Sequence, residues 1–308
     1  MSHRTNYAIR ERGEVRFATS RHDGTSIPDL LFKGADYVRA YIQDERIASA
    51  NDLYSTAQCE GLVLLDIDEH LVLFDGVSEL MFEGAMRRLW YPLLCDVWSG
   101  WTLQHTASPV RHLGQHLRLS RSWIDAKAPD ATLPPSDAQV LLTRHPSFVN
   151  DYQTEIQWCS AGRAWTTTVT DARPLDLLDT GPALLNVLPQ ASAVMPIDRL
   201  APWGLLRIDS QERQLHIWTD LAAYRLAAET EARWPGWSVA LLSLDDAARL
   251  SQQPKRFFPT QSETAHAMDT MRARLDGPAH QPFAQALLLH EALSTKRASP
   301  SWQRGIGS

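Results

Sequence analysis

The sequence has few of the features that mark a secreted, membrane or disulfide-stabilised protein. Its three cysteines, Cys59, Cys95 and Cys159, are far apart and form no C-x-x-C pair. This spacing argues against a disulfide framework and against a zinc site, and it predicts reduced thiols. No apolar run approaches the roughly 18 residues of a membrane-spanning helix. Residues 1–16 are polar and lack the apolar core of a signal peptide, so we expect a cytoplasmic protein.

A basic surface is also missing. The 308 residues include 30 Lys and Arg against 36 Asp and Glu, and the formal net charge is −6. Nucleic-acid binding needs a surface that neutralises phosphates, so we predict no nucleic-acid partner and no membrane partner. A mildly acidic protein is better suited to a basic protein partner. The sequence does not indicate an oligomeric state.

Catalytic signatures are absent as well. The chain has no Walker phosphate loop, no G-x-G-x-x-G fingerprint and no G-x-S-x-G elbow. His112 and His116 are four residues apart, but Leu113 stands where the H-E-x-x-H zinc motif has glutamate. We therefore predict no catalytic residue and no cofactor, and interpret the protein as not an enzyme.

The densest acidic group is a turn that contains Asp66, Asp68 and Glu69. Carboxylates at this spacing offer oxygen ligands for a divalent cation. Aspartate is also common in solvated turns, where it bonds to nearby backbone amides. We favour the solvated turn and predict no metal site.

Two copies of a Trp-x-Gly-Trp motif use four of the 11 tryptophans. Each Trp supplies a large apolar body, and Gly permits the turn that places both rings. Tryptophan is also enriched in binding hot spots. We predict a mainly structural role for the motif, which consists of Trp98, Gly100 and Trp101 in the first copy and Trp234, Gly236 and Trp237 in the second.

These motifs are the last of four anchors that repeat in the same order. The anchors are Gly13 and Gly162, the strings DLLFKG and DLLDTG at 29–34 and 176–181, Leu71 and Leu215, and the two Trp-x-Gly-Trp motifs. The separation shortens from 149 to 136 residues along the chain, as deletions in loops would produce. Collinear repeats of this kind indicate an internal duplication.

Each half is predicted as hairpin, helix, hairpin, helix and strand, in an α+β fold. We expect a mainly antiparallel sheet with helices on one face, followed by a C-terminal helical extension near 243–252, 262–275 and 282–295. The predicted organisation is a first repeat over 1–124, a Pro-, Ala- and Asp-rich linker over 125–137, a second repeat with the C-terminal helices over 138–300, and a flexible tail over 301–308.

Several of these strings resemble a set of uncharacterised bacterial proteins. They are RTNYAIRERGEVRFATSRHDGTSIPDLLFKG at the start, then LLDIDEHLVLFDG, WSGW and WPGW. The resemblance covers residues 4–245 in scattered blocks and departs at SRHDG, where the pattern has a tryptophan near His22. Such proteins are similar in type to the immunity proteins of bacterial polymorphic toxin systems, an analogy that implies a protein partner.

Three functional hypotheses follow. The first is a cytoplasmic immunity-type protein that occludes a basic toxin, with Asp66, Asp68, Glu69, Trp98 and Trp101 as partner contacts. The second is a protein that binds a small ligand in the groove between the two repeats. The third is an unrecognised hydrolase or transferase, which would use residues among His105, His112, His116 and Asp66.

Overall fold

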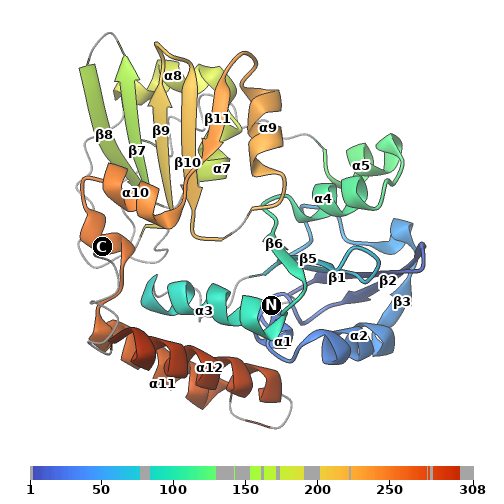
Figure 1. The fold of residues 1–308 in the computed structure, drawn as a ribbon. Helices are drawn as coiled ribbons and strands as arrows, with labels where there is room; N and C mark the ends of the chain where they lie inside the picture. Colours follow the sequence, from blue (N-terminus) through green and yellow to red (C-terminus); the bar gives the residue numbers. More distant parts are fainter. Residues whose placement is uncertain are drawn as a thin grey trace.

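The computed structural model describes residues 3–76, 84–129, 142, 153–160, 163–170, 174–190, 202–221, 223–275, 277 and 280–298. It contains two β-sheets, one in each half of the chain, with helices packed around them (Figure 1). Residues 130–137 of the predicted linker and the predicted tail lie outside the described residues. None of the described helices is long and apolar enough to cross a membrane.

The first sheet has the order β3-β2-β1-β4-β5-β6. Two strand pairs, β1–β4 and β5–β6, are parallel, and the other pairs are antiparallel. The strands are β1 Thr5–Glu11, β2 Glu14–Ser20, β3 Arg46–Ala48, β4 Gly61–Asp66, β5 Leu71–Asp75 and β6 Thr102–His105.

The second sheet has the order β8-β7-β9-β10-β11, which is the order of the first sheet without β3. Its parallel pairs, β7–β9 and β10–β11, are the counterparts of the parallel pairs in the first sheet. The strands are β7 Gln153–Ser160, β8 Arg163–Thr170, β9 Gly204–Asp209, β10 Gln214–Thr219 and β11 Ser238–Leu241. The predicted α+β class and the internal duplication are confirmed. Both sheets are mixed, because the chain crosses over between its hairpins and so brings their first strands side by side in parallel.

The first hairpin forms as its sequence predicts. Arg12 and Gly13 both have positive φ, 56° and 78°, and Glu11 pairs directly with Glu14. A two-residue turn with positive φ at both positions matches the right-handed twist of the flanking strands. The turn therefore consists of Arg12 and Gly13.

Helices cover both faces of the first sheet rather than one. On β4, Val63 and Leu65 pack with α1, α2 and α3, whereas Leu62 and Leu64 pack with α4 and α5. An uninterrupted apolar run is typical of a strand that is buried on both faces. The helices are α1 Ile27–Leu31, α2 Ala35–Asp44, α3 Gly84–Val97, α4 Pro109–His116 and α5 Arg121–Lys127. Residues 125–127 of the predicted linker thus end α5.

The second sheet is covered on both faces in the same way. One face packs against α7 Pro174–Leu178, α8 Leu184–Val187 and α9 Leu226–Arg233. The other face packs against α10 Leu244–Leu250 and Phe257. Short 3₁₀ turns lie at η1 Ala50–Asp52, η3 Gly181–Ala183, η4 Leu188–Gln190 and η5 Pro254–Phe257.

The last two helices, α11 Gln261–Arg274 and α12 Gln281–Ala298, pack on α3 of the first half and lie below it in Figure 1. Met271 and Phe283 are buried in the same core cluster as Trp90 and Leu94 of α3. The sequence grouped these helices with the second repeat because they follow it in the chain. In space they complete the first. We call β1–β6 with α1–α5 the first unit and β7–β11 with α7–α10 the second unit.

The two Trp-x-Gly-Trp motifs adopt one geometry. The Trp98 indole donates a hydrogen bond to the Leu31 carbonyl oxygen at 2.8 Å, and the Trp234 indole donates to that of Leu178 at 2.9 Å. Leu31 and Leu178 hold equivalent places in the repeated DLL strings. The second Trp of each motif packs edge-to-face on the first, with ring centroids 5.4 and 4.9 Å apart. The motif is therefore a structural device that appears once in each unit.

The two units meet along α3, α4 and β6. Arg87 of α3 pairs with Asp220, and both side chains are at least 95 % buried. Arg87 also stacks over the Trp203 ring, with its guanidinium carbon 3.9 Å from the centroid. The backbone N–H of Tyr224 donates to the His105 carbonyl oxygen at 2.8 Å. These contacts attach the second unit to the edge of the first sheet.

Candidate functional site

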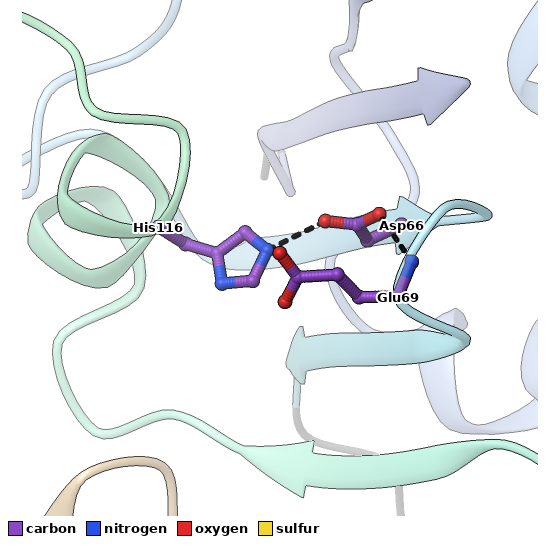
Figure 2. Close-up of side chains that lie close together, drawn as sticks. All are labelled: Asp66, Glu69 and His116. Carbon is purple, nitrogen blue, oxygen red and sulfur yellow. Dashed lines mark hydrogen bonds and ion pairs between the residues drawn. The ribbon is translucent and has the colours of Figure 1, made fainter. Parts of the chain in front are cut away.

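The predicted acidic turn is tied into the first unit. The Asp66 side chain is fully buried at the end of β4, and one of its oxygens, Oδ2, lies 2.7 Å from His116 Nε2 (Figure 2). The same oxygen lies 3.1 Å from Arg10 Nη1. The same guanidinium nitrogen lies 3.1 Å from Glu69 Oε1. The other Asp66 oxygen accepts the Glu69 backbone N–H at 3.0 Å. Both oxygens of Asp66 are therefore engaged within the chain.

Asp68 is held by the neighbouring hairpin. Its two oxygens accept the backbone N–H groups of Arg12 at 2.6 Å and Gly13 at 2.8 Å. These hydrogen bonds to the charged form lower the pKa of the Asp68 carboxyl. The acidic turn thus joins the two hairpins of the first unit, β1–β2 and β4–β5.

Asp66, Glu69 and His116 form a cluster whose ligand atoms all lie within 4.8 Å of one another, close enough for a shared cation. Arg10 already supplies a positive charge to both carboxylates. Its pKa is raised, chiefly by the negative charge of Asp66. A metal ion would compete with this guanidinium, so we interpret the cluster as an ion-pair network and assign no metal to it.

His112 and His116 use both ring nitrogens at the junction of the two units. His112 Nε2 lies 2.7 Å from Glu229 Oε1 of α9, and its Nδ1 lies 2.5 Å from the Thr106 hydroxyl. His116 Nδ1 lies 3.2 Å from the Tyr224 hydroxyl, with Asp66 on its other side. Each imidazole therefore lies between a carboxylate of one unit and a hydroxyl of the other unit. Neither ring has a nitrogen left for a metal or a substrate.

A groove of about 530 Å³ lies between the two units. One wall is α4 with its N-cap, through Ser108, Arg111 and Gln115, and the other is α9, through Glu229, Ala232 and Arg233. Residues 179–183, which connect α7 to α8, complete the lining. We call this feature the inter-unit groove. Its size lies in the range typical of small-molecule sites, and its lining is rich in polar groups.

Charged side chains in the groove are fixed by neighbours. Arg233 Nε pairs with Asp179 Oδ1 at 2.9 Å, and Arg111 Nη2 donates to the Ala128 carbonyl oxygen at 2.8 Å. Groups held in this way lose little conformational freedom when a ligand binds. Both acidic and basic groups therefore face the same space from opposite walls.

The predicted partner contacts differ in their exposure to solvent. Trp98 is 1 % exposed and Asp66 is buried, so neither is accessible to a partner, because each lies inside the contacts that hold the first unit together. Glu69 and Trp101 lie closer to solvent, and Trp101 packs against His70 of the acidic turn with ring centroids 5.2 Å apart. Of the proposed catalytic set, His105 also lies at the junction, 3.3 Å from Asp75.

The sequence analysis did not identify Arg111, Arg233 or Glu229. These residues are 118 to 122 positions apart across the two walls, and no local motif connects them. The one sequence feature that indicated this site was the internal duplication, from which we predicted a groove between the two repeats. Comparison with protein-family models, with curated proteins and with solved structures finds no match to this chain. The resemblance to immunity-type proteins therefore stays a prediction.

Proposed function

We propose that this protein binds a small polar molecule in the inter-unit groove. The observation that carries the proposal is a groove of about 530 Å³ to which both units contribute a helix wall. Sites between domains are a common location for small-molecule binding. The polar lining favours a water-soluble metabolite over a lipid or an extended apolar ligand.

The experiment is a thermal-shift screen of the full chain against nucleotides, sugars, amino acids and organic acids. A ligand that binds the folded state raises the melting temperature, and the rise grows with the logarithm of the ligand concentration above the dissociation constant. The blocking variant is Ala232→Trp, because Ala232 lines the groove. The matched control is Ala228→Trp, one turn earlier on α9, which is exposed and does not line the groove.

We expect a compound that stabilises the wild type and the Ala228→Trp variant but not the Ala232→Trp variant. The proposal is wrong if no compound raises the melting temperature of the wild type, or if a compound raises the melting temperature of both variants as it does that of the wild type. Isothermal titration should give one compound bound per chain for the wild type and Ala228→Trp, and no binding for Ala232→Trp.

A second candidate is the immunity-type protein. The observation that favours it is that Trp101 packs on His70, the neighbour of Glu69 in the acidic turn, where Glu69 and His70 are both exposed. An acidic group beside an aromatic ring suits a basic protein partner. Co-expression with the adjacent gene product tests this candidate: a stable complex and protection from toxicity are expected, and the double substitution Glu69→Gln with Trp101→Ala should weaken both.

A further inference from the structure

We infer that the ligand of the inter-unit groove is an uncharged molecule with several hydroxyl groups, a sugar or a linear polyol. The inference rests on the proposed function, because it names the chemical class of the molecule in that groove. Two features of the lining lead to it: its charges balance, and the fold leaves some of its hydrogen-bonding groups without a partner.

The charged side chains that line the groove balance one another. They are two arginines, Arg111 and Arg233, and two acidic residues, Asp179 and Glu229, so their formal charges sum to zero. Arg233 pairs with Asp179, and Glu229 Oε1 lies 2.7 Å from His112 Nε2. Both arginines have further partners within the chain. A charged ligand would lose hydration on entering the groove and would meet no unpaired charge among the described lining residues.

Ser108 holds the N-cap position of α4, where a serine side chain usually accepts a hydrogen bond from the first turn. Here the Ser108 side chain makes no such bond. Its backbone N–H donates to the Thr106 hydroxyl, and the described part of the chain offers its own hydroxyl no partner. The residue is half-buried and lines the groove. Its hydroxyl, which can both donate and accept, is therefore available to a ligand.

Gln115 and Glu229 add a donor and an acceptor from opposite walls. Gln115 lies seven residues after Ser108 and so on the same face of α4. Its Oε1 accepts a hydrogen bond from Arg225 at 3.4 Å, and its amide N–H groups have no partner in the described part of the chain. The second carboxylate oxygen of Glu229, Oε2, likewise has no partner among the described residues.

Hydroxyl groups match this set of donors and acceptors. A hydroxyl can accept a hydrogen bond from an amide and donate one to a carboxylate at the same time. An ammonium group only donates, and an ionised carboxylate only accepts. A molecule with hydroxyls on neighbouring carbons can therefore bond to Ser108 and Gln115 on one wall and to Glu229 on the other.

The probes are neutral sugars and linear polyols, each paired with its charged amino, acid or phosphate derivative. Binding is measured by isothermal titration to the full chain at low and at high salt. Two variants accompany the wild type. Ser108→Ala removes the unpartnered hydroxyl without removing a helix-capping bond. Ser262→Ala removes a hydroxyl from an exposed residue of α11 that does not line the groove.

At least one neutral probe should bind the wild type and Ser262→Ala, and its charged derivatives should bind about tenfold more weakly. Ser108→Ala should weaken the neutral probe about fivefold at an unchanged melting temperature. Raising the salt concentration should leave the affinity unchanged, because the ligand has no net charge for the salt to screen. Binding by sugars alone or by polyols alone identifies which of the two is the ligand.

The inference is wrong if a charged derivative binds as tightly as its neutral parent, or if Ser108→Ala binds the neutral probe as the wild type does. If only charged compounds bind, and Ala232→Trp abolishes their binding, the inference fails while the proposed function stands. If no compound of any class binds, both are overturned.

Discussion

In the first unit, the surface around Gly34 is covered by the C-terminal helices: a Cβ atom on Gly34 would lie 3.4 Å from Pro282 Cγ of α12. In the second unit, the equivalent glycine, Gly181, borders the inter-unit groove beside Arg233. The two glycines hold equivalent places in the repeat, and both have positive φ. In the first copy the site packs against α12, whereas in the second a Cβ atom on Gly181 would lie 3.0 Å from the Arg233 carbonyl oxygen of α9. The duplication gave both units the same arrangement of strands and helices. The C-terminal helices cover this site in the first unit, whereas the equivalent site in the second unit borders the groove.

The β4–β5 and β9–β10 turns show a similar divergence. Asp66 and Asp209 each accept the backbone N–H of a glutamate three residues later at 3.0 Å, so both turns share one device. In the first unit Asp66 also bonds Arg10 and His116. At the position of Arg10 the second unit has Cys159, whose carbonyl oxygen accepts a turn N–H just as that of Arg10 does. The ion-pair network therefore belongs to one unit, whereas the turn belongs to both.

The largest effect is expected from removing the first indole of each repeated motif. Trp98→Ala and Trp234→Ala should each destabilise the fold by about 3–5 kcal/mol, because each ring is fully buried. Chemical denaturation measures the loss. Trp→Phe at the same positions keeps most of the apolar volume but leaves the Leu31 or Leu178 carbonyl without its donor, so it should cost less. A full loss at one site and none at the other would break the equivalence of the units.

The next effect tests the C-terminal helices. Phe283→Ala should cost about 3–5 kcal/mol, because Phe283 is 2 % exposed and packs edge-to-face on Phe32 at a centroid distance of 5.0 Å. Leu288→Ala is the matched control on α12, where the side chain is 67 % exposed, and it should change stability by less than about 0.5 kcal/mol. Hydrogen exchange should localise the loss from Phe283→Ala to the first unit. Equal effects of the two substitutions would show that α12 does not complete that core.

A smaller effect is expected at the turn glycines of the two motifs. Gly100 and Gly236 have φ of 86° and 79°, and a Cβ atom would meet no backbone at either site. Alanine should therefore cost only the strain of left-handed backbone, about 1–2 kcal/mol at each site. Thermal denaturation of Gly100→Ala and Gly236→Ala should give matching losses. Costs that differ by more than twofold would indicate that the turns are not equivalent.

The smallest effect concerns Asp68, whose counterpart in the second turn is Gln211. The pKa of Asp68 is lowered in the folded protein by the amides of Arg12 and Gly13. The stabilisation is therefore present above the ordinary aspartate pKa of about 3.9 and is lost as the pH falls through the lower folded value. Asp68→Asn should be slightly less stable than the wild type at pH 7 and equally stable in strong acid. A difference that persists at low pH would contradict this account.

Much of the architecture could be predicted because it depends on local patterns. Turn glycines and the repeated anchors indicated the order of the elements and the duplication. The predicted helices at 243–252, 262–275 and 282–295 correspond to α10, α11 and α12. The faces of the sheet were not predicted correctly, although the uninterrupted run LVLL in β4 favours burial on both sides.

The sequence by itself determined two copies of one unit, since the repeated Trp-x-Gly-Trp motifs carry the indole, the glycine turn and the DLL carbonyl that they need. Only the tertiary structure decided that α11 and α12 complete the first unit, that Asp66 is neutralised by Arg10, and that Arg111 and Glu229 face one groove. The physical reason is how far apart in the sequence the contacting residues lie. A turn or a strand is set by residues a few positions apart, whereas the groove brings together side chains more than a hundred residues apart, whose contact depends on how the two finished units pack.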